Sequence, residues 1–349
     1  MAEENGGNMG RYKYIPRNTA GGWEKEGSSP VIGGALGTVF DCCVREDNGE
    51  FRIWYSWRPA RGIAMAYSTD GIHWSLPQLV MPRQINLSWA KDEVNRPCVL
   101  YRNGKYLMWF IGMVRPEDFE YGHTAVGYAE SMDGIHWDVY KEPVMVPEKP
   151  WEKSSLYCPH VIWDDKESVY KMWYSGGEQY ECDCIGYAES KDGIHWEKYG
   201  DNPVFTADKS RFWEALKTEA CCVIKDEEYY YMFYLGISAD RMSAIGVARS
   251  RDGISGWERH PDNPVIAGTD GGWDYMGVCK PFVLWTEEGY RMWYNGCNQS
   301  EGEGQIKEEI GVARHKGHKL WPDSDGPRER NIPDEEFVCR DLFLRSEEH

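Results

Sequence analysis

The chain has 349 residues and a formal net charge of −18 at pH 7, and 14% of its residues are aromatic. A chain this acidic repels nucleic-acid phosphates, so we expect no nucleic-acid partner. No apolar run approaches the roughly 20 residues of a membrane-spanning helix, so we expect no membrane partner either. The acidic N-terminus has no apolar secretory core and the chain holds 11 cysteines, which together predict reduced thiols in the cytoplasm.

The N-terminal region divides into a flexible part and one strand. Residues 1–20 are polar and rich in glycine, so we expect them to be flexible. The next segment, Trp23–Ile32, resembles the later segment Trp257–Ile266, and both end in Pro-Val-Ile. We therefore predict an outer strand within residues 21–33 that has no partner nearby in the sequence.

A short phrase then recurs about every 60 residues. In its first copy it reads Ser-Thr-Asp-Gly-Ile-His-Trp. Asp-Gly suits a tight turn, the serine and aspartate can bond to the backbone of that turn, and the tryptophan anchors the returning strand. Because the histidine recurs with the turn, we assign it a structural role. The copies are Ser68–Trp74, Ser131–Trp137, Ser190–Trp196 and, with one inserted residue, Ser250–Trp257.

Each unit around this phrase contains four short strands. An inner strand with a shared valine comes first, followed by an aromatic strand and a strand of small residues, and a last strand follows the phrase. Four such strands with Gly or Pro turns are typical of a β-propeller blade. The chain is therefore predicted to be all-β, a five-bladed β-propeller with four-stranded blades at about residues 37–82, 89–147, 151–207, 213–268 and 273–321.

The outer strand within residues 21–33 is predicted to close the fifth blade. The turn of that blade, His315–Trp321, is degenerate, and a strand from the N-terminus would remove an open sheet edge. Residues 21–321 would then form one domain. We expect residues 322–349 to form a tail packed on its outside.

A ligand is expected on the axis of this ring. When the inner strands are aligned on their valine, two preceding columns differ from unit to unit, although the valine and the turns do not. Such divergence inside a regular frame indicates residues chosen by a ligand, and buried charges need a partner or a ligand. One column holds Asp41, Arg96, Cys158, Ala220 and Lys280, and the other holds Phe40, Asn95, Tyr157, Glu219 and Cys279.

Other residues are expected near the same rim. Trp89 and Trp213 belong to a tryptophan that recurs before four inner strands, so we expect mainly blade packing and, for one of them, a ring face offered to a sugar. Arg58 lies on a loop that opens at this rim, and His160 is not repeated. The candidate substrate-binding residues are therefore Arg96, Lys280, Asn95, Tyr157, His160, Trp89 and Arg58.

We expect no cofactor and no metal. The segment Cys182-Asp183-Cys184 alone is poor evidence for a zinc site, and the chain has no phosphate-binding glycine loop. The cysteines that crowd the inner strands are interpreted as small apolar residues that fit a narrow axis. The sequence leaves the oligomeric state open.

The units resemble the five-bladed propeller glycosidases, the clan of arabinanases, xylosidases, invertases and levansucrases, with related mannoside phosphorylases. The resemblance rests on the four-stranded units, on Asp41 in the first inner strand and on the Ser-x-Asp-x-x-x-Trp turn. It implies three catalytic acids on the first three blades. Asp41 matches the first, Glu93 is among the acids nearest the second, and the third place, beside Tyr157, holds no acid.

Two functions remain open at this stage. In the first, Asp41 is the base or nucleophile and Glu219 the acid of a glycoside hydrolase-like enzyme, with Arg96 and Lys280 binding an anionic group of a cytoplasmic carbohydrate. In the second, the incomplete acid set marks an altered propeller that binds a sugar-like metabolite or performs a different reaction. A purely structural alternative is that the four charged residues neutralise one another in a cluster of ion pairs, an ion-pair plug, with no ligand. These residues are Asp41, Arg96, Glu219 and Lys280.

Overall fold

The computed structural model describes residues 18–114, 123–178, 181–239, 241–299 and 306–322. Their regular structure consists of β-strands and short 3₁₀ turns, which confirms the all-β class. None of the described helices is long and apolar enough to cross a membrane. Asn18–Ala20 are the last residues of the stretch expected to be flexible, but they are buried. The Ala20 N–H also donates to Val265 O at 2.9 Å. Residues 1–17 and the expected tail from 323 onward lie outside the described residues.

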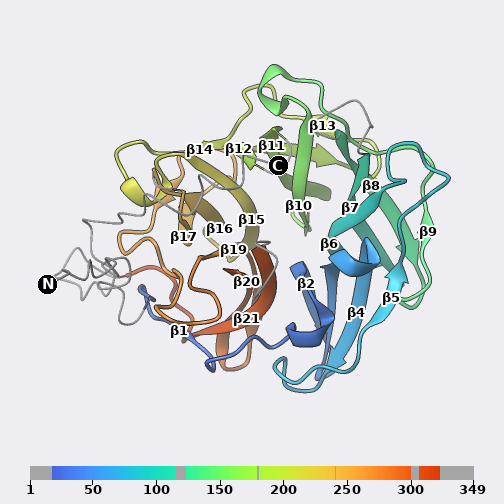
Figure 1. The fold of residues 1–349 in the computed structure, drawn as a ribbon. Helices are drawn as coiled ribbons and strands as arrows, with labels where there is room; N and C mark the ends of the chain where they lie inside the picture. Colours follow the sequence, from blue (N-terminus) through green and yellow to red (C-terminus); the bar gives the residue numbers. More distant parts are fainter. Residues whose placement is uncertain (1–17, 115–122, 179–180, 240, 300–305, 323–349) are drawn as a thin grey trace, which may run out of the picture.

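Three groups of consecutive strands form separate antiparallel sheets, in which sequence neighbours pair with one exception (Figure 1). The first holds β2 (Val39–Asp47), β3 (Glu50–Trp57), β4 (Gly62–Ser68) and β5 (Gln78–Met81). The second holds β6 (Glu93–Arg102), β7 (Lys105–Val114), β8 (His123–Ser131) and β9 (Asp138–Val139). The third holds β10 (Ser155–Asp164), β11 (Val169–Glu178), β12 (Glu181–Ser190), β13 (Glu197–Lys198) and β14 (Phe205–Thr206). The exception is β14, which pairs with β12.

The remaining strands form one eight-stranded sheet that consists of two antiparallel groups. A single parallel bridge, Ser243 to Gly277, connects the two groups. The fourth group holds β15 (Lys217–Lys225), β16 (Tyr230–Ile237), β17 (Ser243–Ser250) and β18 (Glu258–Arg259). The fifth holds β19 (Gly277–Thr286), β20 (Gly289–Gln299), β21 (Ile306–Lys316) and, from the other end of the chain, β1 (Trp23–Lys25).

Strand β1 pairs with β21, the strand that the sequence match selected as its partner. Trp23 lies opposite His315, and Lys25 lies opposite Ala313. The Lys25 ammonium also lies 2.6 Å from the fully buried Asp274 carboxylate. Related ion pairs join the outer strand to the loop before the inner strand in the third and fourth groups, so β1 makes the contacts of an outer strand. These pairs are Lys198–Glu152 at 2.8 Å and Arg259–Glu214 at 2.5 Å.

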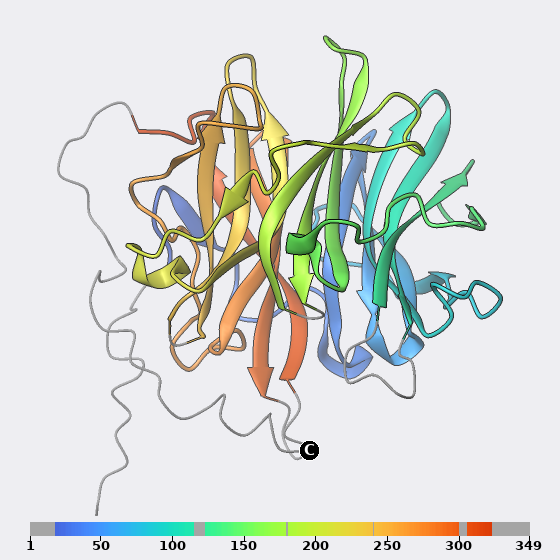
Figure 2. The same cartoon turned by 90° about the horizontal axis from the view of Figure 1, so that it is seen from above.

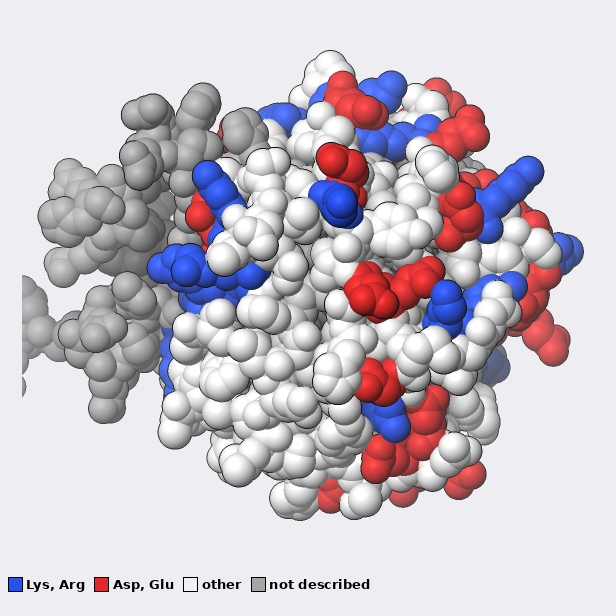
Figure 3. All heavy atoms as spheres, turned by 90° about the vertical axis from the view of Figure 1, so that its right-hand side faces the viewer, with Lys and Arg blue, Asp and Glu red and all other residues white. Residues whose placement is uncertain are grey.

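The first strands of the five groups lie together at the centre of Figure 1. Each of these strands contacts the next one: β2 contacts β6, β6 contacts β10, β10 contacts β15 and β15 contacts β19. The cycle closes because β19 contacts β2. Figure 2, turned by 90°, shows the groups side by side with the axes of most strands roughly aligned. On the face drawn in Figure 3, acidic and basic side chains form small mixed groups.

Each second strand except β16 carries a buried tryptophan that binds the turn of the next group. Its indole N–H donates to the glycine carbonyl of the Asp-Gly turn, which satisfies a polar group that would be costly to bury alone. The bonds are Trp54 to Gly134 at 2.9 Å, Trp109 to Gly193 at 2.8 Å, Trp173 to Gly253 at 2.8 Å and Trp293 to Gly71 at 3.0 Å. The last of them connects the fifth group to the first.

The repeated turn is held by its own aspartate. Asp70 Oδ1 accepts the N–H groups of Ile72 and His73 at 2.9 and 2.8 Å, and His73 Nδ1 lies 2.7 Å from Asp70 Oδ2. The bond to His73 is the main cause that lowers the pKa of Asp70. His136 and His195 make the same contact with Asp133 and Asp192. The repeated histidines therefore have the structural role expected for them.

Candidate functional site

Of the two variable columns of the sequence, the one that begins with Asp41 coincides with a β-bulge in every inner strand. The register of each inner strand against its neighbour shifts at this point, and the bulged residue has a positive φ. Residues other than glycine are strained in that conformation and persist where the surroundings enforce it. The five bulged residues are Asp41 (φ 50°), Arg96 (56°), Cys158 (50°), Ala220 (48°) and Lys280 (46°).

Side chains from the second strand of the preceding group support three of these bulges. Ser56 Oγ accepts the N–H of Arg96 at 2.7 Å, and Ser175 Oγ accepts that of Ala220 at 2.8 Å. Asn295 Oδ1 accepts the N–H of Asp41 at 2.9 Å. The bulged backbone thus keeps its hydrogen bonds although it leaves the ladder.

Asp41 is 4% exposed and has three side-chain partners. Its Oδ2 lies 2.9 Å from Arg96 Nε and 3.8 Å from the Cys158 thiol, and its Oδ1 accepts Asn295 Nδ2 at 2.6 Å. The ion pair with Arg96 and the bond from Asn295 hold the carboxylate in a fixed orientation.

Glu93 and Asn95 belong to a polar chain behind Arg96. Glu93 Oε1 accepts Asn95 Nδ2 at 2.8 Å, and Asn95 Oδ1 accepts Arg96 Nη1 at 3.0 Å. The Arg96 guanidinium also lies over the Tyr157 ring, 4.4 Å from its centroid. These contacts hold Arg96 against Asp41.

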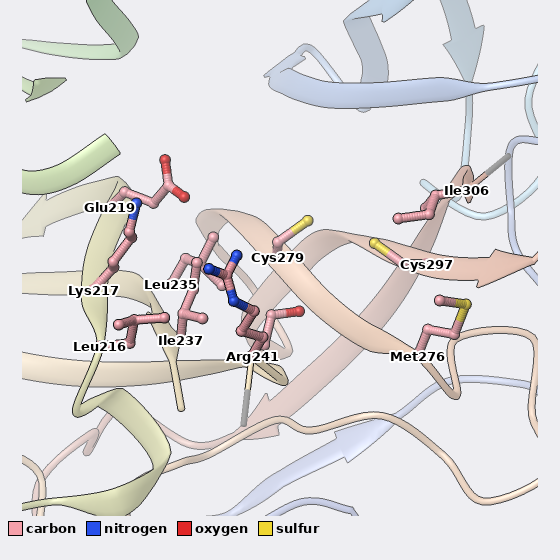
Figure 4. A pocket seen from close by; sticks show the side chains of 11 residues that line it. Leu216, Lys217, Glu219, Leu235, Ile237, Arg241, Met276, Cys279, Cys297 and Ile306 are labelled. Carbon is pink, nitrogen blue, oxygen red and sulfur yellow. The ribbon is translucent and has the colours of Figure 1, made fainter. Parts of the chain in front are cut away.

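Glu219 lines the wall of a cavity of about 240 Å³, beside Lys217 and near Arg241 (Figure 4). Burial raises its pKa to about 8, against the opposing effects of Arg96 and Lys217 and with a smaller contribution from Asp41. The carboxyl group is therefore mostly protonated at neutral pH. A neutral carboxylic acid can donate a proton to a leaving oxygen.

Lys280 is 5% exposed, and in the described part of the chain its ammonium has no hydrogen bond or ion pair. Burial disfavours its charge, but Cys158 and then Asp41 offset burial, so its pKa lies above the usual value. Glu219 likewise makes no ion pair with a described residue. Of the four charges considered for a plug, only Asp41 and Arg96 pair directly. The plug is thus incomplete, and a cavity lies beside it.

Glu308 and Asn295 are members of the site that the sequence reasoning missed. Glu308 Oε1 lies 3.5 Å from Asn295 Nδ2, and its Oε2 lies 3.7 Å from Arg58. Burial and then Asp41 raise the pKa of Glu308. The side chain of Arg58 is 42% exposed. A signal for Glu308 existed, because it occupies the place before the small-residue strand that Asp183 occupies in the third unit.

The His160 side chain bonds to the next inner strand. Its Nε2–H donates to Val223 O at 2.9 Å, and burial lowers its pKa to about 3, so the ring is neutral. Cysteines fill the equivalent places in three other inner strands, where their sulfurs accept a main-chain N–H of the next inner strand. These contacts are Val99 to Cys43 and Val161 to Cys98 at 3.2 Å, and Val283 to Cys222 at 3.3 Å. His160 is therefore a structural link, and the cysteines do more than fill space.

Trp89 packs inside its own group and not on the axis. Its indole N–H donates to Lys141 O at 2.8 Å, and its ring stacks on Phe110 with centroids 5.9 Å apart. A Cβ at Gly112 or Gly127 would collide with this ring. The ring face expected to bind a sugar is therefore already used for packing. Trp213 packs in the same way against Gly236 and Gly246.

Comparison with known proteins agrees with this all-β fold. The model of the family described as glycosyl hydrolases family 43 matches residues 29–308. The chain is 26% identical over 277 residues to the 1,2-beta-oligomannan phosphorylase of Thermoanaerobacter sp. (strain X514), covering 75% of this chain and 86% of that protein.

Two further similarities are narrower. An uncharacterized protein of Mycobacterium tuberculosis is 30% identical over 145 residues, and this match spans 40% of the present chain and only 45% of that relative. Among solved structures, one described as a glycoside hydrolase superposes with a TM-score of 0.68 at 19% identity, covering 90% of this chain and 96% of the other. At that identity the likeness shows the fold alone.

Proposed function

The chain belongs to glycosyl hydrolases family 43, and from this premise we propose that it is a carbohydrate-active enzyme that cleaves a glycosidic bond with Asp41 and Glu219. The observation that carries the proposal is the contrast between these two buried acids. Asp41 forms an ion pair with Arg96 and accepts a hydrogen bond from Asn295, whereas Glu219 has a pKa of about 8 on the wall of a cavity. Acid and base roles differ between carboxyl groups for this kind of reason.

In the proposed reaction Glu219 donates its proton to the glycosidic oxygen as the bond to the anomeric carbon breaks. Asp41 either attacks that carbon or takes a proton from the attacking water. Arg96 and Asn295 keep the Asp41 carboxylate oriented, and Glu93 and Asn95 keep Arg96 in place. The stereochemical outcome would follow from the separation of the two carboxyl groups when a substrate is bound.

We propose that the fold that carries this site is a five-bladed propeller spanning about residues 21–321. The cycle of contacts among the inner strands supports it. The pairing of β1 with β21 and the Trp293–Gly71 bond give further support, because both connect the fifth group to an earlier part of the chain.

The substrate is proposed to carry a carboxylate or phosphate and to be met in the cytoplasm. Lys280 supports the first point, because a buried ammonium without a bonded partner among the described residues calls for an anion. The described cysteines support the second, because they are free thiols.

Phosphorolysis is a second candidate, favoured by the same ammonium. In that reaction inorganic phosphate replaces water as the attacking group, and Lys280 would help to hold it. The similarity to a protein described as a 1,2-beta-oligomannan phosphorylase supports this alternative.

The test is a product assay on a panel of neutral and acidic oligosaccharides, run with and without inorganic phosphate. Hydrolysis predicts free reducing sugar in both conditions, and phosphorolysis predicts a sugar 1-phosphate only when phosphate is present. Glu219→Gln and Asp41→Asn should each remove product formation. If no panel member is cleaved in either condition while the protein is folded, the enzymatic proposal is wrong for these substrates, and the binding alternative gains support.

A further inference from the structure

Cys279, Cys297 and Glu308 form a cluster of potential metal ligands that the proposed reaction does not use. They lie on the three neighbouring strands β19, β20 and β21, where Cys297 is paired directly with Glu308 and Cys279 lies diagonally across from Cys297. One ligand atom from each residue lies within 4.8 Å of the others. Figure 4 shows the two sulfur atoms directed toward each other in the wall of the cavity.

We propose that Cys279, Cys297 and Glu308 bind a zinc ion whose fourth coordination position opens into the cavity beside Glu219. Two thiolates and a carboxylate suit zinc in type and in number. Catalytic zinc sites hold the metal by three protein groups and leave one position for water or substrate, and thiolates select zinc over magnesium and calcium. A substrate hydroxyl or carboxylate oxygen is the ligand class that such an open position takes.

The surroundings of the cluster resemble a supporting shell for metal ligands. Asn295 Nδ2 lies 3.5 Å from Glu308 Oε1, and Arg58 lies 3.7 Å from Glu308 Oε2. Groups that orient the ligands in this way are a regular part of metal sites. Because Asn295 also bonds to Asp41 at 2.6 Å, the site would be connected to the proposed catalytic acid.

The pair of thiols differs from the structural cysteines of the inner strands. Cys43, Cys98 and Cys222 each accept a main-chain N–H from the next inner strand. Cys279 instead lies 3.9 Å from Glu308 Oε1, and both sulfurs of the pair face the cavity. Their arrangement is thus not required by the repeat of the fold.

The test uses the full-length protein, purified metal-free and kept reduced. Cobalt(II) should produce the thiolate-to-metal charge-transfer absorption of sulfur ligation, and zinc should displace it with one equivalent per chain. X-ray absorption on the zinc form should then give two sulfur neighbours at about 2.3 Å. This measurement needs no variant and no activity, so its outcome is independent of whether the enzyme cleaves a glycoside.

Variants then assign the ligands. Cys297→Ser should weaken zinc binding by at least about 100-fold, the upper end of what losing a mere supporting partner costs, and should remove one sulfur neighbour. Glu308→Gln should weaken binding and keep both sulfurs. Cys184→Ser, a cysteine outside the cluster, should leave affinity unchanged. The proposal is overturned by absent sulfur ligation, by equal losses in the control, or by a disulfide between Cys279 and Cys297 forming in place of metal binding under reducing conditions.

Discussion

The Asn295 side chain bonds to both the main chain and the side chain of Asp41. Its Oδ1 accepts the Asp41 main-chain N–H at 2.9 Å, and its Nδ2 donates to Asp41 Oδ1 at 2.6 Å. The equivalent serines, Ser56 and Ser175, provide only the first of these bonds for the residues that they support. One side chain of the fifth group therefore fixes both the strained backbone and the carboxylate of the proposed catalytic acid in the first.

The variant Asn295→Ser separates the two bonds. A serine can still accept the Asp41 N–H, as it does elsewhere in this fold, so the free energy of unfolding should change little. The lost bond to the carboxylate is of the charge-assisted kind, so kcat/KM should fall about 10- to 100-fold. Steady-state kinetics and chemical denaturation measure the two effects. A variant as active as the wild type would show that the amide does not orient Asp41.

Asp41→Asn tests the proposed base or nucleophile itself. The change keeps the size of the side chain and removes its charge, so the protein should fold while turnover drops by at least about 100-fold. Activity is measured on whichever substrate the panel identifies, with thermal unfolding as the check on folding. Normal turnover in the folded variant would exclude the role given to Asp41.

Glu219 should give activity an upper pH limit. Its pKa of about 8 means that the protonated form needed for acid catalysis is lost as pH rises through 8. Above that value kcat/KM should fall about tenfold per pH unit. Glu219→Gln should be inactive on poor leaving groups at all pH values. If the profile of the wild type is flat from pH 7 to 10, Glu219 is not the acid.

The same shift predicts a stability trend with a definite sign. The pKa of Glu219 is raised from 4.5 in the unfolded chain to about 8 in the fold, so between these values the folded state binds more protons. The contribution of Glu219 to stability therefore falls as pH rises across this window and is constant above it. Thermal unfolding should show Glu219→Gln gaining on the wild type from pH 5 to 8, by a few degrees at the upper end.

Lys280 is the better probe of ligand charge, because Arg96 already pairs with Asp41. Uronic acids, sugar phosphates or inorganic phosphate should raise the melting temperature of the wild type more than matched neutral sugars do. In Lys280→Met this preference should shrink, and the stability without ligand should not fall, since an unpaired buried charge has been removed. Equal responses to neutral and acidic ligands in both proteins would contradict an anionic substrate.

Closure of the ring is tested by removing one indole. Phe233 stands in the fourth group where the other second strands have tryptophan, so Trp293→Phe is sterically matched to the fold. Because Trp293 bonds to Gly71 as Trp54 bonds to Gly134, the two Trp→Phe variants should be destabilised to a similar extent, by about 1–3 kcal/mol. Chemical denaturation gives both values. No loss in Trp293→Phe beside a clear loss in Trp54→Phe would mean that the first and fifth groups are not joined.

The internal repeat made the frame predictable. Aligning the inner strands on their valine selected the column of residues that the bulges hold at positive φ, although the bulge itself has no obvious sequence signature. The match between Trp23–Ile32 and Trp257–Ile266 placed β1 beside β21 for the same reason. Aligned copies of one unit show which residues occupy equivalent positions in their strands, which a single strand does not. The position of a residue within the unit could therefore be predicted without knowing any contact.

What the repeat could not supply was contact between different columns. Asn295 and Glu308 come from the second and third strands of the fifth group, and an alignment of inner strands carries no information about residues of other strands that reach the same point. The bond from His160 to the next inner strand could not be predicted, because its equivalents are cysteines, which share its ability to bond that strand and little else. Nothing in the spacing of Trp89 indicated that its ring packs against Gly112 and Gly127. The metal cluster spans three strands and has no ligand spacing to recognise.

The bulge repeated in each inner strand has a consequence for how this molecule could acquire new chemistry. Cys158 and Ala220 already have the left-handed backbone that Asp41, Arg96 and Lys280 have, so the local cost of that conformation is present whether or not the residue is charged. A mutation to aspartate or lysine at either place would change a side chain at the centre and leave the path of the chain untouched. The five bulged positions thus share one backbone conformation. The chemistry at the centre can therefore evolve by single substitutions at these positions while the strands keep their arrangement.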